Sequence, residues 1–135
     1  MKSRLRSATG FARDTGGAAA VEFAIVSTAF LSFLFAIAYL GLIMFTDATL
    51  QWAVEKSSRL AAIDPTVTQT EIAAAVNSYL ASANGPTANV TYNVSTSGSV
   101  KTGTIAASVT KSYTVPMIKT FDITYTASTS VPIGS

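Results

Sequence analysis

A single carboxylate near the start of a long apolar run is the residue best placed to do chemistry in this sequence. Glu22 is the only charged residue between Ala18 and Phe45. An ionisable side chain at membrane depth is energetically costly and by default indicates a function. Gly17 precedes the run, and Phe23 follows Glu22 directly. Gly17, Ala18, Glu22 and Phe23 are therefore the candidate functional residues.

The apolar run that carries Glu22 predicts a transmembrane helix over residues 18–45. A run of about 20 apolar residues covers the ~30 Å hydrocarbon core, and this one contains no proline to kink it. Residues 46–64 continue as an amphipathic helix. Its expected apolar stripe consists of Leu50, Ala53, Val54, Ser57, Leu60 and Ala61.

Composition excludes several classes of chemistry. The chain has no cysteine and no histidine, so disulfides, thiolate metal sites, histidine-based zinc sites and Ser-His-Asp or Cys-His catalysis are all ruled out. The net charge is only +2, and no basic patch is interleaved with aromatic residues. We therefore expect no metal, no cofactor, no small-molecule substrate, no nucleic-acid partner and no enzymatic activity.

Charge is distributed unevenly around the apolar run. The leader, residues 1–17, carries Lys2, Arg4, Arg6 and Arg13 against Asp14, whereas the remainder has five basic and six acidic residues. Because basic flanks are retained in the cytoplasm, the N-terminus is predicted inside and the C-terminus outside the membrane. An uncleaved signal anchor remains an alternative. A conventional secretory signal peptide fits poorly, because the apolar run is too long.

The spacing of Gly17 and Glu22, followed by the aromatic Phe23, resembles the processing site of type IV prepilins. Together with the basic leader, the sequence Gly-Ala-Ala-Ala-Val-Glu-Phe resembles that of the TadE/TadG-like pseudopilins of tight-adherence (Flp-type) pili. The resemblance covers roughly residues 16–62. The resemblance implies cleavage by a prepilin peptidase after Gly17, with Ala18 as the new N-terminus. It also implies other pilins or pseudopilins and the pilus assembly machinery as partners.

Two interpretations of Glu22 follow from its position. In a lone helix the carboxylate reaches the headgroups and contributes little. In an assembled bundle it is removed from water and needs a positive partner, which the free amine of a neighbour's Ala18 would supply. Glycine at position 17 is expected to offer the peptidase an unhindered, extended backbone.

Short side chains at four-residue intervals predict a second contact feature. Such ridges let helix backbones approach closely in a bilayer. Together with Glu22, the candidate subunit-contact residues are Ala20, Ala24, Thr28, Ser32 and Ala36.

Residues 65–135 are predicted to form a small exported α+β domain. Asp64-Pro65 ends the long helix, and the capping box of Thr68 and Glu71 starts a second helix over 69–82. Period-2 alternation then predicts an antiparallel sheet of about three strands, over 88–96, 104–115 and 120–131. The stripe of the long helix is expected to cover one face of this sheet.

These features together predict a non-catalytic minor pilin or pseudopilin of the bacterial inner membrane, single-pass, that acts in assembly or priming of a tight-adherence type pilus. A membrane-anchored periplasmic binding or scaffold module that is never processed is the main alternative. A tethered envelope enzyme is disfavoured by the missing nucleophile–base pairs. By resemblance, a major filament subunit is disfavoured by the length of the chain.

Overall fold

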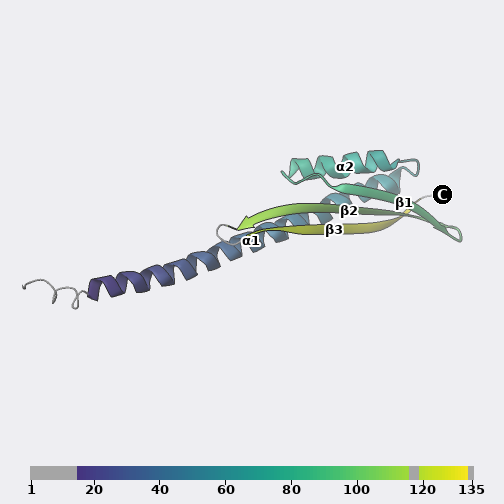
Figure 1. Cartoon of the computed structure of the whole chain (residues 1–135). Helices are drawn as coiled ribbons and strands as arrows, with labels where there is room; N and C mark the ends of the chain where they lie inside the picture. Colours follow the sequence, from purple (N-terminus) through teal and green to yellow (C-terminus); the bar gives the residue numbers. More distant parts are fainter. Residues whose placement is uncertain (1–14, 116–118, 134–135) are drawn as a thin grey trace, which may run out of the picture. The chain divides into compact units, whose positions relative to one another are not determined.

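The computed structural model describes residues 15–115 and 119–133. Two helices precede three strands: α1 (Thr15–Ile63), α2 (Gln69–Ser82), β1 (Asn89–Ser97), β2 (Val100–Val115) and β3 (Lys119–Ile133) (Figure 1). The chain divides into two compact units, Met1–Gly41 and Leu42–Ser135, and α1 contributes to both. The observed elements confirm the α+β class expected from the sequence.

α1 is a continuous helix of 49 residues, about 73 Å long at 1.5 Å per residue. It begins three residues before the expected start at 18. Its hydroxyl side chains do not interrupt it, because they donate to carbonyls one turn earlier, as Thr28 does to Ala24 at 2.8 Å. Pro65 cannot continue the helix, and the Asp64 side chain accepts a hydrogen bond from the Thr66 amide at 2.9 Å in the turn that follows.

α2 is held at both ends by its own sequence. The Thr68 hydroxyl accepts from the Glu71 amide, and the Glu71 carboxylate accepts from the Thr68 amide at 2.8 Å, which completes the predicted capping box. At the other end, Asn84 adopts a left-handed conformation (φ 53°). There the Gly85 amide donates to the Leu80 carbonyl at 2.7 Å, as in a Schellman motif.

The three strands form one antiparallel sheet in the order β1-β2-β3. A two-residue turn at Gly98 and Ser99 joins β1 to β2, and Gly98 supplies the positive φ (63°) that this turn needs. β2 begins at Val100, not at residue 104 as expected. Gly103 lies within the strand and pairs with Val94 of β1 and Val131 of β3. A β-carbon at Gly103 would lie 2.9 Å from side-chain atoms of Tyr92 and Ile133, so a larger residue there would force these side chains to shift.

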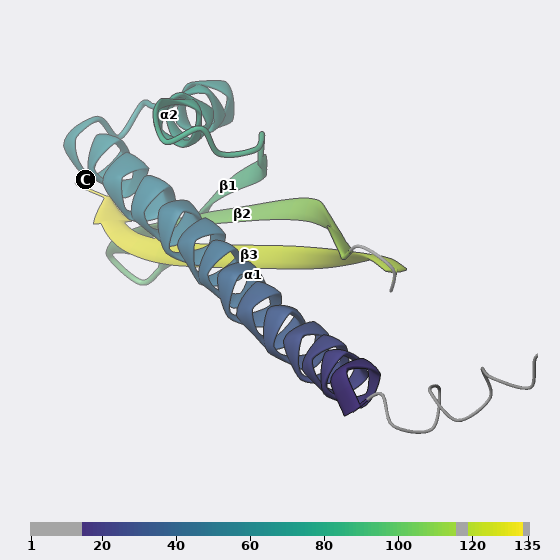
Figure 2. The same cartoon turned by 90° about the vertical axis from the view of Figure 1, so that its left-hand side faces the viewer.

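The core of the second unit lies between one face of the sheet, α2 and the part of α1 that follows Leu42 (Figure 2). α2 contributes Ile72, Val76 and Leu80. The sheet contributes Val90, Tyr92, Ile105, Ala107, Val109, Tyr113, Tyr125, Ala127 and Ile133. The buried residues of α1 are Thr46, Leu50, Ala53, Val54, Ser57, Ser58 and Ala61. The expected packing of a helical stripe on a sheet is therefore present.

The expected stripe is wrong at one position and incomplete at two. Leu60 is 39 % exposed, whereas Thr46 and Ser58 are buried. Burial is possible for both hydroxyls because they bond to α1 carbonyls, Thr46 to Leu42 at 2.9 Å and Ser58 to Glu55 at 2.7 Å.

The opposite face of the sheet is rich in hydroxyl groups and exposed. Threonine and serine side chains pair across β2 and β3 at 2.9 Å, in the pairs Thr104–Ser130, Thr110–Thr124 and Thr114–Thr120. Such cross-strand pairs fix the register of an antiparallel sheet.

Candidate functional site

Gly17 lies in the first turn and a half of α1, so its backbone is helical and not extended as expected. A β-carbon built on Gly17 would meet no atom within 4 Å. The fold of the described chain therefore does not require glycine at this position. Each glycine in a helix costs roughly 1 kcal/mol relative to alanine, so the pair Gly16–Gly17 makes this end of α1 comparatively easy to open.

Glu22 lies just over one turn after Gly17, with its side chain exposed. Its surroundings on α1 are apolar and equally exposed: Phe23 is 73 % exposed, and Val21, Ile25 and Val26 are similar. Within residues 15–115 and 119–133, no charged side chain contacts Glu22. The Glu22 carboxylate thus lies on an apolar helix surface, and the described part of the chain provides no cation to pair with it.

The predicted ridge of short side chains runs along the same stretch of α1. Ala20, Ala24, Thr28, Ser32 and Ala36 are all exposed. The Thr28 and Ser32 hydroxyls donate to the carbonyls of Ala24 and Thr28 at 2.8 Å, so their hydrogen-bonding needs are met within the helix. A shallow groove along this stretch is lined by Val21, Ala24, Ile25, Thr28, Ala29 and Ser32. The ridge is available for close approach, and its role as a subunit contact stays a prediction.

α1 is the one described helix that is long and apolar enough to cross a membrane, with a mean hydropathy of 2.2 in its most apolar window. None of that window is buried by the described chain. The apolar side chains between Val21 and Phe45 therefore need a lipid or protein environment, which agrees with single-pass membrane anchoring.

In the second unit, a chain of buried hydroxyl groups joins α1 to the sheet. The Tyr113 and Tyr125 hydroxyls are 2.7 Å apart, and the Thr46 hydroxyl lies 3.4 Å from that of Tyr113. Burial, the hydrogen bond with Tyr113, the nearness of the Tyr113 hydroxyl and the negative charge of Asp47 raise the pKa of Tyr125 well above its usual value. Tyr125 therefore stays neutral at any physiological pH and acts as a hydrogen-bonding group.

A cation between two aromatic rings joins α1 to α2. The Lys56 ammonium lies 5.0 Å from the centre of the Trp52 ring and 4.8 Å from that of Tyr79. The two rings meet edge to face with centroids 5.6 Å apart. Sequence reasoning missed this cluster, although Trp52 and Lys56 are four residues apart on one helix face and signal such a contact.

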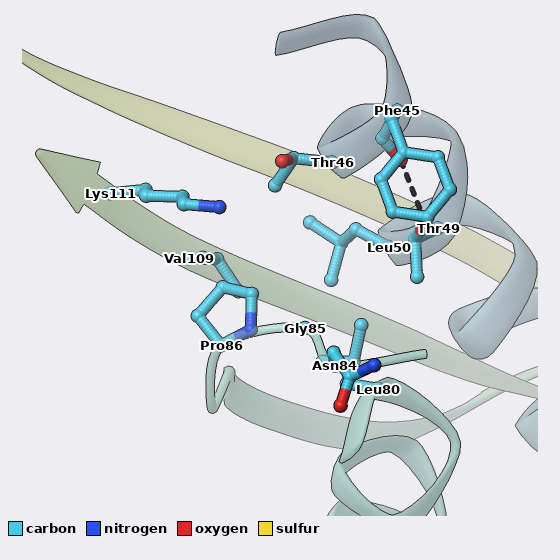
Figure 3. Close-up of a pocket in the computed structure, with 10 residues that line it drawn as sticks. All are labelled: Phe45, Thr46, Thr49, Leu50, Leu80, Asn84, Gly85, Pro86, Val109 and Lys111. Atoms are coloured by element: carbon cyan, nitrogen blue, oxygen red, sulfur yellow. Dashed lines mark hydrogen bonds between the residues drawn. The ribbon is translucent and has the colours of Figure 1, made fainter. Parts of the chain in front are cut away.

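One pocket of the second unit has a volume of about 30 Å³. It lies between α1, the C-terminal end of α2 and β2, where Leu50, Leu80, Pro86 and Val109 line it (Figure 3). That is room for about one water molecule, far below the 300–1,000 Å³ of a typical small-molecule site. Nor do the described residues contain a group of three or more acidic, histidine or cysteine side chains that could hold a metal ion.

Comparison with known proteins adds a family assignment for the helix. Residues 17–59 match the family model described as TadE-like protein. A search of curated proteins and a search of solved structures found no match. The matched segment begins at Gly17 and includes Ala18, Glu22 and Phe23, the residues on which the resemblance rested. Over residues 17–59 this chain is therefore similar to the TadE-like family, a similarity that implies a role in tight-adherence pilus systems.

Proposed function

We propose that this chain is a minor pilin or pseudopilin whose work is assembly or priming of a tight-adherence type pilus, with no catalytic activity of its own. The observation that carries the proposal is the placement of Gly17 and Glu22 at the start of α1, whose most apolar segment the described chain leaves uncovered. A prepilin peptidase of the inner membrane would cut between Gly17 and Ala18. The processed helix would then leave the bilayer for a bundle with other subunits.

Glu22 would set the axial position of the subunit in that bundle. The support is its exposure on an apolar surface and the absence of a cation among the described residues around it. Transfer into a dry bundle would leave the charge unpaired, which costs several kcal/mol. The new amine of Ala18 on a neighbouring subunit is a cation of the right kind, created by cleavage one helical turn away from Glu22.

Sequencing the N-terminus of the membrane-extracted protein tests the proposal. We expect Ala18 as the first residue of the wild type and an intact leader in Gly17→Leu. Gly41→Leu is the matched control: a β-carbon at Gly41 also meets nothing within 4 Å, so it makes the same change in the same helix away from the cut. We expect normal processing of Gly41→Leu. Processing of Gly17→Leu at the wild-type position, or an intact N-terminus on the wild type, would contradict the proposal.

A further inference from the structure

The two edges of the sheet differ in what covers them. At the β1 edge, α2 satisfies main-chain groups that point away from β2. The Asn77 side chain bonds to both the amide and the carbonyl of Ala88, at 2.8 and 3.3 Å, and the Gln69 amide donates to the Val90 carbonyl at 3.5 Å. At the β3 edge, no other described strand or helix pairs with the main chain (Figure 2).

The register identifies which groups β3 presents. The two-residue turn makes Ser97 and Val100 a hydrogen-bonded pair, so the even-numbered residues of β2 bond to β1 and the odd-numbered ones to β3. The main-chain groups of even-numbered β3 residues therefore point outward, from Thr120 to Ser130. Pro132, which has no N–H to offer, stands at such an outward position.

This edge lacks the usual protection over most of its length. Exposed edges are normally shortened or interrupted by charges and proline, because they pair readily with other chains. Here Lys119 and Asp122 stand at one end and Pro132 at the other, and residues 123–131 contain neither a charge nor a proline. An unprotected edge of this length is a template for an added strand.

A groove runs beside this edge. Glu55 lines it, and Asp47 lies about two helical turns earlier on α1, outside the lining; these two carboxylates are called the acidic wall. The groove has a volume of about 410 Å³ and is lined by residues 126–129 of β3 and by Gln51, Val54 and Glu55 of α1. Asp47, Gln51 and Glu55 follow one another at four-residue intervals along α1, and the Gln51 amide donates to Asp47 at 2.8 Å. No basic side chain lines the groove.

We propose that the free edge of β3 takes up an extended segment of another protein, which adds a fourth strand and directs basic side chains toward Asp47 and Glu55. Main-chain hydrogen bonds would provide affinity, and the acidic wall would select the segment. Asp47 and Glu55 are about 12 Å apart along the helix, which matches about 13 Å for four residues of a strand. The segment therefore carries lysine or arginine at two positions four residues apart.

A second copy of this chain fits the groove less well. From Thr120 to Ile133 the chain contains no lysine or arginine, so pairing of β3 with another β3 would place no cation against the acidic wall. The inference goes beyond the proposed function and does not depend on it, because the groove lies wholly in the second unit and needs neither cleavage after Gly17 nor Glu22.

Fluorescence anisotropy of a labelled peptide with the full chain in detergent micelles tests the proposal. The probe has the sequence Thr-Lys-Thr-Val-Thr-Lys-Thr, in which the two lysines are four residues apart. We expect saturable binding that weakens with added salt. We also expect slower hydrogen exchange at the amides of Thr126 and Ser128. A peptide with glutamate in place of each lysine should not bind. The lysine peptide methylated at alternate backbone nitrogens should not bind either.

Variants separate the edge from the wall. Ser128→Pro removes an outward N–H and should abolish binding, whereas Thr96→Pro, at the matched outward position of β1, should leave it unchanged. Glu55→Lys changes an exposed side chain without touching the core and should weaken binding about tenfold, the result of losing one favourable charge pair and adding a repulsive one. No binding of the lysine peptide, equal binding of the glutamate peptide, or unchanged binding by Ser128→Pro would overturn the proposal. Self-association abolished by Ser128→Pro would overturn it in favour of a second copy.

Discussion

Carboxylates in this chain are mostly held by hydrogen bonds to their neighbours. Asp47, Asp64, Glu71 and Asp122 each accept at least one hydrogen bond from a side chain. Glu22 differs, because it stands on an exposed apolar helix surface with no charged neighbour among the described residues. The energetic contribution of Glu22 thus depends on what surrounds the helix. Substitution of Glu22 therefore tests whether the helix is packed against other subunits.

Glu22→Ala should insert into the membrane and accumulate there but fail to cross-link or co-purify with other pilus subunits. Removing one partner of a buried ion pair costs on the order of 3–5 kcal/mol. About 1.4 kcal/mol already changes an equilibrium tenfold. Insertion should be unharmed, since the segment becomes more apolar. Glu22→Gln should behave like Glu22→Ala, because it keeps the shape and loses the charge.

Glu22→Asp is the control for this prediction, because it keeps the negative charge and should retain measurable association. Normal co-purification of both Glu22→Ala and Glu22→Gln would show that the carboxylate only reaches the headgroups.

Among the elements, α2 is the one whose position rests on both local and long-range contacts. Its capping box fixes the N-terminal end, and Asn77 and Gln69 bind it to the β1 edge. Lys56, between Trp52 and Tyr79, holds it against α1. α2 covers one sheet edge, so its stability decides whether that edge stays protected.

Thr68→Ala should lower the free energy of unfolding by about 1 kcal/mol, the usual cost of losing an N-cap side chain. Thr70→Ala is the matched control, and its effect should be neutral or slightly stabilising because alanine favours helix interiors. Thermal unfolding of the full chain in detergent, followed by circular dichroism, measures both. Equal destabilisation by the two substitutions would show that the cap contributes nothing specific.

The same cap predicts a pH dependence. Hydrogen bonds from the amide and then the hydroxyl of Thr68 lower the pKa of Glu71 below its usual 4.5. Asp64, bonded to Thr66, has a lowered pKa too. A lowered folded-state pKa adds stability above the unfolded-state value, and that stability is lost as pH falls through the folded-state value. Unfolding measured from pH 7 to 3 should therefore show a shallower acid loss for Glu71→Gln than for wild type.

For the whole molecule, α1 is the element that both units share. About 20 residues suffice to cross the hydrocarbon core, and the 49 residues of α1 are more than twice that number. The excess carries the buried stripe of the second unit, so one helix serves as membrane segment and as core. The apolar segment and the second unit thus share a single secondary-structure element, α1.

The charge asymmetry around α1 predicts the orientation of the chain. A reporter fused after Ser135 should behave as exported. Lys101 and Lys119, both exposed on the sheet, should be cleaved by trypsin only after the outer envelope is opened. A C-terminus that reacts from the cytoplasmic side would refute this topology and, with it, the proposed pilin function.

Local signals predicted the elements themselves well. The apolar run without proline predicted the long helix, and Thr68 with Glu71 predicted the start of α2, because capping and helical periodicity act over a few residues. The start of β2 was misplaced because Gly103 resembles a strand breaker in sequence. In the structure it lies within the strand, against the side chains of Tyr92 and Ile133, which would have to shift to admit a β-carbon.

What the sequence by itself determined is the order and type of the elements, the apolar helix and the position of Glu22 upon it. Only the tertiary structure decided which residues of α1 are buried, since Leu60 of the expected stripe is exposed whereas Thr46 and Ser58 are buried against the rest of the second unit. It also brought together Thr46, Tyr113 and Tyr125, and left the β3 edge open beside Gln51 and Glu55. These features join residues far apart in the chain, and such contacts depend on strand register and helix rotation, which local periodicity does not encode.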